Sequence, residues 1–230
     1  MSWTPSTLER MPEGFPDLPL PGLAGDSLFA RLEPLLEQVS KPIQYVGGEL
    51  NSTVKDWDCG GFGPEGQELT ARWALMYPDA YEVGLPNQGV MILYEVINER
   101  PDALAERTYA VWPDMEALLR REGVSQFTVD GHRALADFDL FGVSFSTELG
   151  YTNMLTALDL AGIPLHARDR GDEDPLVIAA GHPTFNPEPT SASLDASNVA
   201  AGAQAGPALT LTPTPLTAQR PPGGAPRPCP

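Results

Sequence analysis

The sequence predicts an α/β fold built on a doubly wound, mostly parallel sheet. Residues 69–189 contain short, nearly continuous apolar runs, such as 72–77 and 139–146, and each run ends in a loop rich in Gly, Pro, Asn, Ser or acidic residues. Strands that are buried on both faces of a sheet have this apolar character. Stretches with helical spacing of apolar residues separate the runs, which predicts right-handed crossovers between parallel strands.

The elements follow one another along the chain. We expect strands at residues 72–77, 108–111, 125–129, 138–145, 163–166 and 176–180. A first helix is predicted over residues 87–99, with Asn87 as its cap. A second should run through Met115 and Leu119 after Pro113, and a third should end near Gly162.

Composition divides the chain into four parts. Prolines and glycines interrupt residues 1–25, which predicts a flexible arm, and residues 26–68 should form a helix and an irregular lead-in. Asp26 is a suitable cap for that helix, which Pro34 should kink or interrupt. Residues 41–55 are interpreted most simply as a packed surface loop. The α/β domain should occupy 69–189, and the Ala-, Pro- and Thr-rich residues 190–230 should be disordered.

Charge and cysteine content exclude several classes of function. The 14 basic and 31 acidic residues give a formal net charge of −17, which disfavours binding to nucleic acids and to anionic membranes. The two cysteines, Cys59 and Cys229, are too few for a disulfide framework and indicate a reducing, cytoplasmic environment. No apolar run reaches the length of about 20 residues that a membrane-spanning helix needs, and the N-terminus lacks the pattern of a secretory signal.

Function should reside in the loops that follow the strands, because ligands bind open parallel sheets beyond the carboxyl ends of their strands. The candidate binding residues carry polar side chains or are glycines that let a backbone approach a ligand: Asp79, Tyr81, Glu82, Gly84, Asn87 and Gly89; Ser144, Ser146, Thr147 and Glu148; and Gly181, His182 and Asn186. The simpler alternative is that these residues cap helices and form turns. His132 and His166 are expected to be structural, hydrogen-bonded histidines.

Several blocks of sequence occur in a characteristic order. They include Tyr77-Pro78-Asp79-Ala80-Tyr81-Glu82-Val83-Gly84, then Trp112-Pro113-Asp114-Met115, then Tyr151-Thr152-Asn153, and finally Phe185-Asn186-Pro187-Glu188-Pro189. Together, over residues 41–189, the chain resembles the N-terminal domain of an uncharacterised family of radical S-adenosylmethionine (SAM) proteins. The resemblance implies a flavodoxin-like or cobalamin-binding-like fold, cobalamin as a possible cofactor, and a radical SAM catalytic domain as partner. It implies an iron–sulfur cluster and S-adenosylmethionine only in full-length relatives.

Two departures from known patterns limit this resemblance. A radical SAM cluster needs three cysteine thiolates at C-x3-C-x2-C spacing, and Cys59 and Cys229 cannot supply them. We therefore expect no turnover by this chain alone and suspect that it is truncated after residue 189. A histidine ligand to cobalt would require Asp-x-His-x-x-Gly after the first strand, where residues 78–84 contain no histidine.

Three classes of function remain open from the sequence. The chain is a cofactor-binding module, most plausibly for cobalamin; or a structural or docking cap for a radical SAM barrel, in which residues 41–51 and the loops press on the barrel; or a free-standing nucleotide or flavin binder. A nucleotide or flavin binder would require a G-x-G-x-x-G loop, and neither residues 78–84 nor the segment around Gly47-Gly48 has this spacing.

Overall fold

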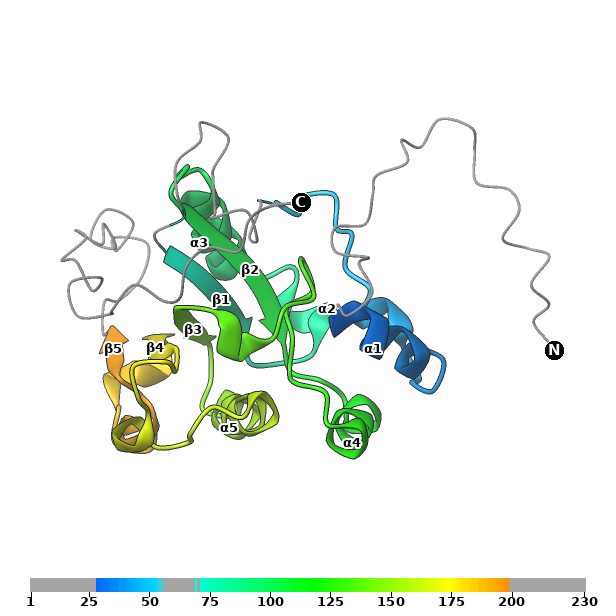
Figure 1. Ribbon diagram of the computed structural model, residues 1–230. Coiled ribbons are helices and arrows are strands. Elements are labelled where there is room, and N and C mark those ends of the chain that lie inside the picture. Colours follow the sequence, from blue (N-terminus) through cyan, green and yellow to red (C-terminus); the bar gives the residue numbers. More distant parts are fainter. Residues whose placement is uncertain (1–27, 54, 56–68, 70, 199–230) are drawn as a thin grey trace, which may run out of the picture.

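The computed structural model describes residues 28–53, 55, 69 and 71–198. Five parallel strands form one sheet in the order β2-β1-β3-β4-β5. Their bounds are Ala71–Tyr77 (β1), Ala103–Tyr109 (β2), Leu140–Phe145 (β3), Leu176–Gly181 (β4) and Ala196–Asn198 (β5). The chain moves outward from β1 to β2 and then crosses back to β3, so the direction of winding reverses between β1 and β3 (Figure 1). This order confirms the predicted doubly wound α/β class.

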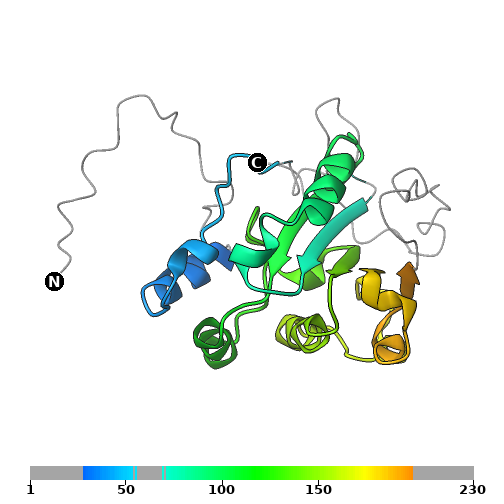
Figure 2. The same ribbon diagram turned by 180° about the vertical axis from the view of Figure 1, so that it is seen from behind.

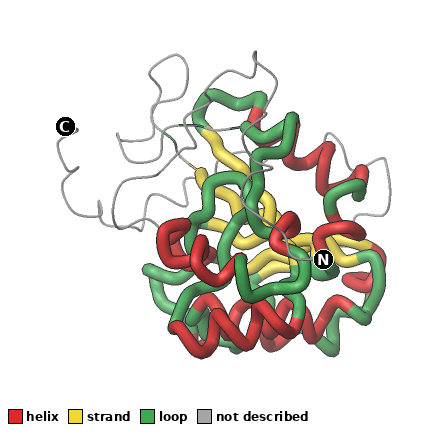
Figure 3. The backbone as a smooth tube through the Cα atoms, turned by 90° about the vertical axis from the view of Figure 1, so that its right-hand side faces the viewer, coloured by secondary structure: helices red, strands yellow, loops and turns green. Residues whose placement is uncertain are grey.

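Helices cover the sheet on both faces. The α-helices are α1 (Leu28–Leu36), α2 (Tyr81–Gly84), α3 (Gln88–Asn98), α4 (Pro113–Glu122) and α5 (Gly150–Ala161). Short 3₁₀ helices occupy η2 (Pro42–Gln44), η3 (Leu135–Asp137), η4 (Ala167–Asp169), η5 (His182–Phe185) and η6 (Ser191–Ser193). Helix α3 lies on one face, and α4 and α5 lie on the other (Figures 1 and 2). In the side view of Figure 3 the strands form the middle layer.

Alternating side chains of the strands build two cores. On β1, Trp73 and Leu75 face α3 and contact Tyr94, while Met76 faces α5 and joins a cluster with Met154. A third cluster joins α1 to α4. Each fully buried large apolar side chain contributes about 1.5–3 kcal/mol relative to an exposed one, so these clusters fix the positions of the loops.

The predicted helix ends are confirmed at three places. Asn87 caps α3, since its side chain accepts a hydrogen bond from the backbone N–H of Val90 at 3.1 Å. Helix α4 begins at Pro113, and α5 ends at Ala161 with Gly162 as its C-cap in a left-handed conformation with φ +71°. Pro34 lies inside α1, which ends at Leu36.

Three predicted strands differ from the structure. The second strand occupies 103–109 rather than 108–111, because the charged residues Glu106 and Arg107 are accommodated in the buried strand β2. Residues 125–129 contribute only an isolated antiparallel bridge between Phe127 and Ala134. Residues 163–166 form a loop before η4, and Pro164 in that loop has no N–H to donate to a strand partner.

Ordered structure also continues past residue 189, where we expected the domain to end. Strand β5 pairs in parallel with β4, and Asp195 anchors it by accepting hydrogen bonds from the Val177 backbone N–H and the Arg170 side chain, each at 2.7 Å. The expected arm, Asp26, and the part of the expected tail from 199 onward lie outside the described residues. None of the helices described is long and apolar enough to cross a membrane.

Candidate functional site

The carboxyl ends of β1, β3 and β4 bring the three predicted loops to one edge of the sheet. Tyr77, the last residue of β1, donates a hydrogen bond from its hydroxyl to Ser146 Oγ just after β3, at 3.1 Å. Phe145 at the end of β3 pairs in register with Gly181 at the end of β4. The sequence therefore predicted correctly which loops are neighbours.

Most predicted residues after β1 support local structure. The carboxylate of Asp79 accepts a hydrogen bond from the next backbone N–H, and Asn87 caps α3. Gly84 lies against Tyr109, and a Cβ at position 84 would be 2.4 Å from Cδ1 of that ring. Gly89 belongs to the first turn of α3. This matches the simpler alternative, in which these residues form caps and close packing contacts.

Tyr81 and Glu82 instead face the lead-in segment 41–53, which we call the strap. Glu82 accepts hydrogen bonds from Lys41 Nζ at 2.8 Å and from Gln44 Nε2 at 2.7 Å. The hydrogen bond from the Lys41 ammonium contributes most to a lowered pKa of the Glu82 carboxyl. The Tyr81 hydroxyl donates to Glu49 of the strap. These two predicted residues therefore attach the strap to α2.

The residues after β3 and β4 are more exposed. Ser144 is half-buried at the end of β3, and Thr147 and Glu148 are exposed. Gly181 has φ +116°, and a Cβ there would lie 1.9 Å from the carbonyl oxygen of Phe145, so only glycine fits. His182 contacts Phe185 within η5, and Asn186 follows this turn at the surface.

The crevice between the ends of β1 and β3 is filled. Asn153 of α5 donates a hydrogen bond to the carbonyl oxygen of Pro78 at 2.9 Å, and a Cβ on Gly150 would lie 2.6 Å from the Pro78 ring. The two best-formed hollows among the described residues measure only about 10 and 40 Å³, far below the usual range of about 300–1,000 Å³ for ligand pockets. The described residues also contain no cluster of three potential metal ligands.

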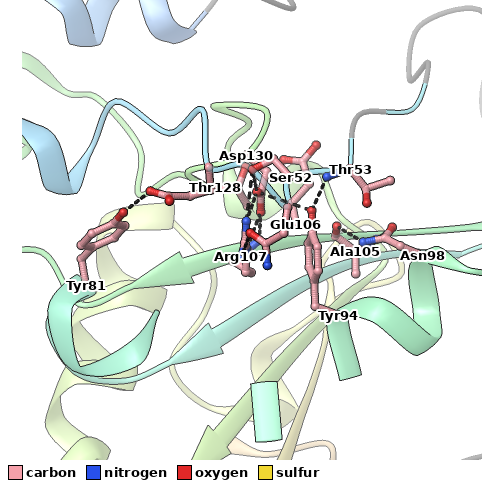
Figure 4. Close-up of polar contacts among 12 residues, drawn as sticks. Ser52, Thr53, Tyr81, Tyr94, Asn98, Ala105, Glu106, Arg107, Thr128 and Asp130 are labelled. Carbon is pink, nitrogen blue, oxygen red and sulfur yellow. Dashed lines mark hydrogen bonds and ion pairs between the residues drawn. The ribbon is translucent and has the colours of Figure 1, made fainter. Parts of the chain in front are cut away.

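A buried ionic cluster on β2 was missed by the sequence analysis (Figure 4). Arg107 and Asp130 form an ion pair at 2.7 Å, and each side chain is only 1% exposed. Arg107 also donates to Asn51 Oδ1 and Ser52 Oγ of the strap, both at 3.1 Å, and its guanidinium lies 4.3 Å from the ring centroid of Tyr94. Burial lowers the pKa of Arg107, but the bonds and the charge of Asp130 more than offset this and raise it.

Glu106 occupies the opposite side of β2. Its carboxylate accepts a hydrogen bond from Thr128 Oγ1 and lies 3.6 Å from Arg133 Nε. Burial raises the pKa of Glu106 to about 7, although Thr128 and Arg133 act in the opposite direction. With Asp130, these contacts hold residues 127–134 along the outer edge of β2 and protect it from pairing with other chains.

The strap makes several polar contacts on its inner side and exposes two large apolar side chains on its outer side. Its inner contacts extend to Tyr94, whose hydroxyl accepts a hydrogen bond from the backbone N–H of Thr53 at 2.6 Å. On its outer side, Ile43 is 65% exposed and Leu50 is fully exposed. Further large apolar side chains are exposed in the segments that follow β1, β3 and β4: Val83, Leu149 and Phe185.

His132 is half-buried and hydrogen-bonded, as a structural histidine should be. Its Nε2 lies 2.9 Å from the carbonyl oxygen of Tyr45, and its ring contacts Phe29 and Phe127. Burial lowers the pKa of His132 and favours the neutral ring. His132 thus joins the strap to the segment that covers β2.

The fold and this site define a parallel α/β domain whose lead-in strap is anchored by a buried ion pair. The family described as radical SAM proteins, N-terminal, matches residues 89–212, which is more than half of the chain. The chain therefore belongs to this family, whose full-length members combine such a domain with a radical SAM catalytic domain. No curated protein and no solved structure matches the chain.

Proposed function

We propose that this domain is a docking module that binds the catalytic domain of a radical SAM protein through its strap and carboxyl-edge loops. The arrangement of the strap carries the proposal. Its polar side chains are used in contacts with Glu82 and Arg107, whereas Ile43 and Leu50 are exposed. A surface segment that exposes large apolar side chains without moving freely is typical of a protein–protein interface.

Anchoring of the strap supports binding for an entropic reason. A free segment must lose conformational freedom when a partner orders it, at a cost of about 0.5–1.5 kcal/mol for each immobilised flexible side chain. The hydrogen bonds from Arg107 to Asn51 and Ser52 order these side chains when the domain folds, before any partner binds. The strap would therefore meet its partner in a preformed conformation.

Cobalamin binding is the second candidate function. The strand order β2-β1-β3-β4-β5 favours it, because sheets wound in this way bind ligands where the winding reverses. Ser144, Ser146 and Gly181 are the small residues nearest that edge. The residues present do not fit the nucleotide tail of the cofactor, however, since Asn153 and Gly150 close the crevice against Pro78. Cobalamin therefore ranks below docking.

We also propose that the chain supplies no radical SAM cluster of its own. Cys59 and Cys229 are its only cysteines, and a cluster of this type needs three at close spacing. Catalysis would then belong to the partner domain. A nucleotide or flavin binder is the weakest alternative, because residues 78–84 lack the glycine spacing of a phosphate loop.

The docking proposal is tested by titrating the full chain with the purified catalytic domain of a family member. The double variant I43S/L50S should reduce affinity at least tenfold without lowering the melting temperature, because both side chains are exposed. The control I92S/V96S removes side chains on α3 that are 59% and 53% exposed and should bind normally. Equal affinity of the two double variants for the catalytic domain would contradict the proposal. Cobalamin that stays bound after desalting and competes with the catalytic domain would also contradict it.

A further inference from the structure

Three unsatisfied polar atoms border one hollow beneath the strap. Among the described residues, Gln44 Oε1, Gln126 Oε1 and the Tyr109 hydroxyl are buried and have no hydrogen-bond partner. Residues Gln44, Gln126 and Tyr109 all line a small hollow of about 10 Å³ at the carboxyl end of β2, which has room for one group the size of a water molecule. Leaving a buried polar group unpaired is costly, so this convergence indicates that a hydrogen-bonding group fills the hollow.

The orientations of the Gln44 and Gln126 side-chain amides are fixed by the hydrogen bonds that their nitrogen atoms donate. Gln44 Nε2 donates to the Glu82 carboxylate at 2.7 Å, and a carboxylate can only accept. Gln126 Nε2 donates to the backbone carbonyl oxygen of Tyr109 at 3.0 Å. Rotating either amide by 180° would place two acceptors against each other. Both amide oxygens are therefore the groups left for an occupant, which must donate hydrogen bonds to them.

The remaining walls of the hollow are aromatic and aliphatic, the latter supplied by Ala110, Val111 and Val129. Tyr81 and Tyr109 meet edge to face with ring centroids 5.5 Å apart, and Tyr45 and Phe127 do so at 6.3 Å. Aromatic faces carry partial negative charge and attract cations. No charged side chain lines the hollow within the described part of the chain.

Charges just outside the lining also favour a cation. Glu82 contacts Gln44, and Glu49 contacts Tyr81, so two carboxylates stand immediately behind the walls. Glu82 is already paired with Lys41 and the nearby Arg107 with Asp130, so Glu49 supplies the negative charge that these pairs do not offset. The chain as a whole carries a formal net charge of −17. The charges near the hollow and the net charge of the chain are both negative, and both would attract a cation.

We propose that this hollow binds a primary ammonium group. Such a group is about the size of a water molecule, carries one positive charge, and offers three N–H donors and no acceptor. It would donate to Gln44 Oε1, Gln126 Oε1 and the hydroxyl oxygen of Tyr109, and the rings would surround it. The group could be the tip of a lysine side chain of a partner or a free alkylamine. This proposal does not depend on the docking proposal.

The test uses the full chain and ¹⁵N-labelled ammonium or methylammonium chloride, with sodium chloride at equal ionic strength as the reference. A distinct bound ¹⁵N resonance and a melting temperature that rises with ammonium or methylammonium but not with sodium are expected. Tetramethylammonium, which has no N–H, should have no effect. The absence of a bound resonance together with equal melting temperatures in ammonium and sodium would show that the hollow holds only water, and would overturn the proposal.

A variant makes the assignment specific. Tyr109→Phe keeps the ring and removes a hydroxyl that has no partner among the described residues, so the free protein should be as stable as the parent or more stable. Affinity for methylammonium should fall at least tenfold. Tyr151→Phe removes a hydroxyl on α5 that is not part of the hollow and should leave affinity unchanged. Binding that survives Tyr109→Phe at full strength would place the cation elsewhere and overturn the proposal.

A second set of titrations separates the two sources of the ammonium group. A peptide from the catalytic domain whose lysine occupies the hollow should compete with methylammonium, and acetylation of that lysine should abolish the competition. If methylammonium binds and no such peptide competes, a free amine is the ligand and the proposal stands with that source. The docking proposal is judged separately by the I43S/L50S variant.

Discussion

Arg107 and Asp130 form an ion pair at 2.7 Å that is almost wholly removed from solvent, and this pair holds the strap on the domain. Asp130 accepts three hydrogen bonds from Arg107, including one from its backbone N–H. The geometry satisfies both charges inside the protein. A buried pair of this kind is costly to break, because removing one partner leaves the other charge buried without compensation.

Replacing Asp130 should therefore destabilise the domain strongly. Asp130→Ala is expected to lower the free energy of unfolding by about 3–5 kcal/mol, the usual cost of an uncompensated buried charge. Chemical denaturation monitored by circular dichroism measures this. Glu122→Ala is the matched control, since the Arg121–Glu122 pair has the same distance of 2.7 Å but both side chains are exposed, and such pairs contribute at most about 1 kcal/mol. Similar losses in both variants would contradict the assigned role of the buried pair.

Glu106 should make stability depend on pH in a predictable direction. Its pKa in the folded protein is raised to about 7 from an ordinary value of 4.5. Between these two pH values the folded protein keeps the proton and the unfolded chain loses it, so the free energy of unfolding declines as pH rises from about 4.5 to 7. Glu106→Gln mimics the neutral carboxyl. The variant should equal the parent near pH 4 and exceed it by up to about 3 kcal/mol at pH 8. A difference that does not change with pH would show that Glu106 is not the titrating group.

His132 should also make stability depend on pH, but through this residue the free energy of unfolding should decline as pH falls. Because burial lowers its pKa in the folded protein, protonation favours the unfolded chain, and stability is lost as pH falls through the unfolded value of about 6.5. Asn tolerates the positive φ of 50° at this position. His132→Asn should therefore be less sensitive to pH between 7 and 5 than the parent, measured by thermal unfolding at each pH. Identical pH profiles would remove His132 from this role.

The close contact between β3 and β4 depends on Gly181. Gly181→Ala should lower the free energy of unfolding by at least about 2 kcal/mol, because the added Cβ would meet the Phe145 carbonyl oxygen at a positive φ. Thermal unfolding provides the measurement. Gly171→Ala is the comparison, since a Cβ there meets nothing within 4 Å. If Gly181→Ala proved as mild as Gly171→Ala, steric restriction would not explain this glycine.

The sequence predicted the sheet and its loops more reliably than the contacts between distant segments. Local signals were sufficient for the cap at Asn87 and the helix end at Gly162. The neighbouring positions of Ser146 and Gly181 followed from parallel pairing, because strands that run in one direction end at one edge.

Long-range pairs left no such signal. Arg107 and Asp130 are 23 residues apart, and the charge of Arg107 made its strand difficult to recognise. Strand β5 was missed because three residues carry little pattern and depend on Asp195 for their anchorage. The available hint was the position of Glu106 and Arg107 between the apolar residues 103–105 and 109–112.

Hydrogen–deuterium exchange tests the docking account most directly, because it reports which backbone segments a partner covers. Adding the catalytic domain of a family member to the full chain should slow exchange in residues 41–53 and in the loops that contain Val83, Leu149 and Phe185. Exchange on the outer face of α3, around Ile92 and Val96, should not change. Protection confined to α3, with unchanged exchange in residues 41–53, would contradict the account.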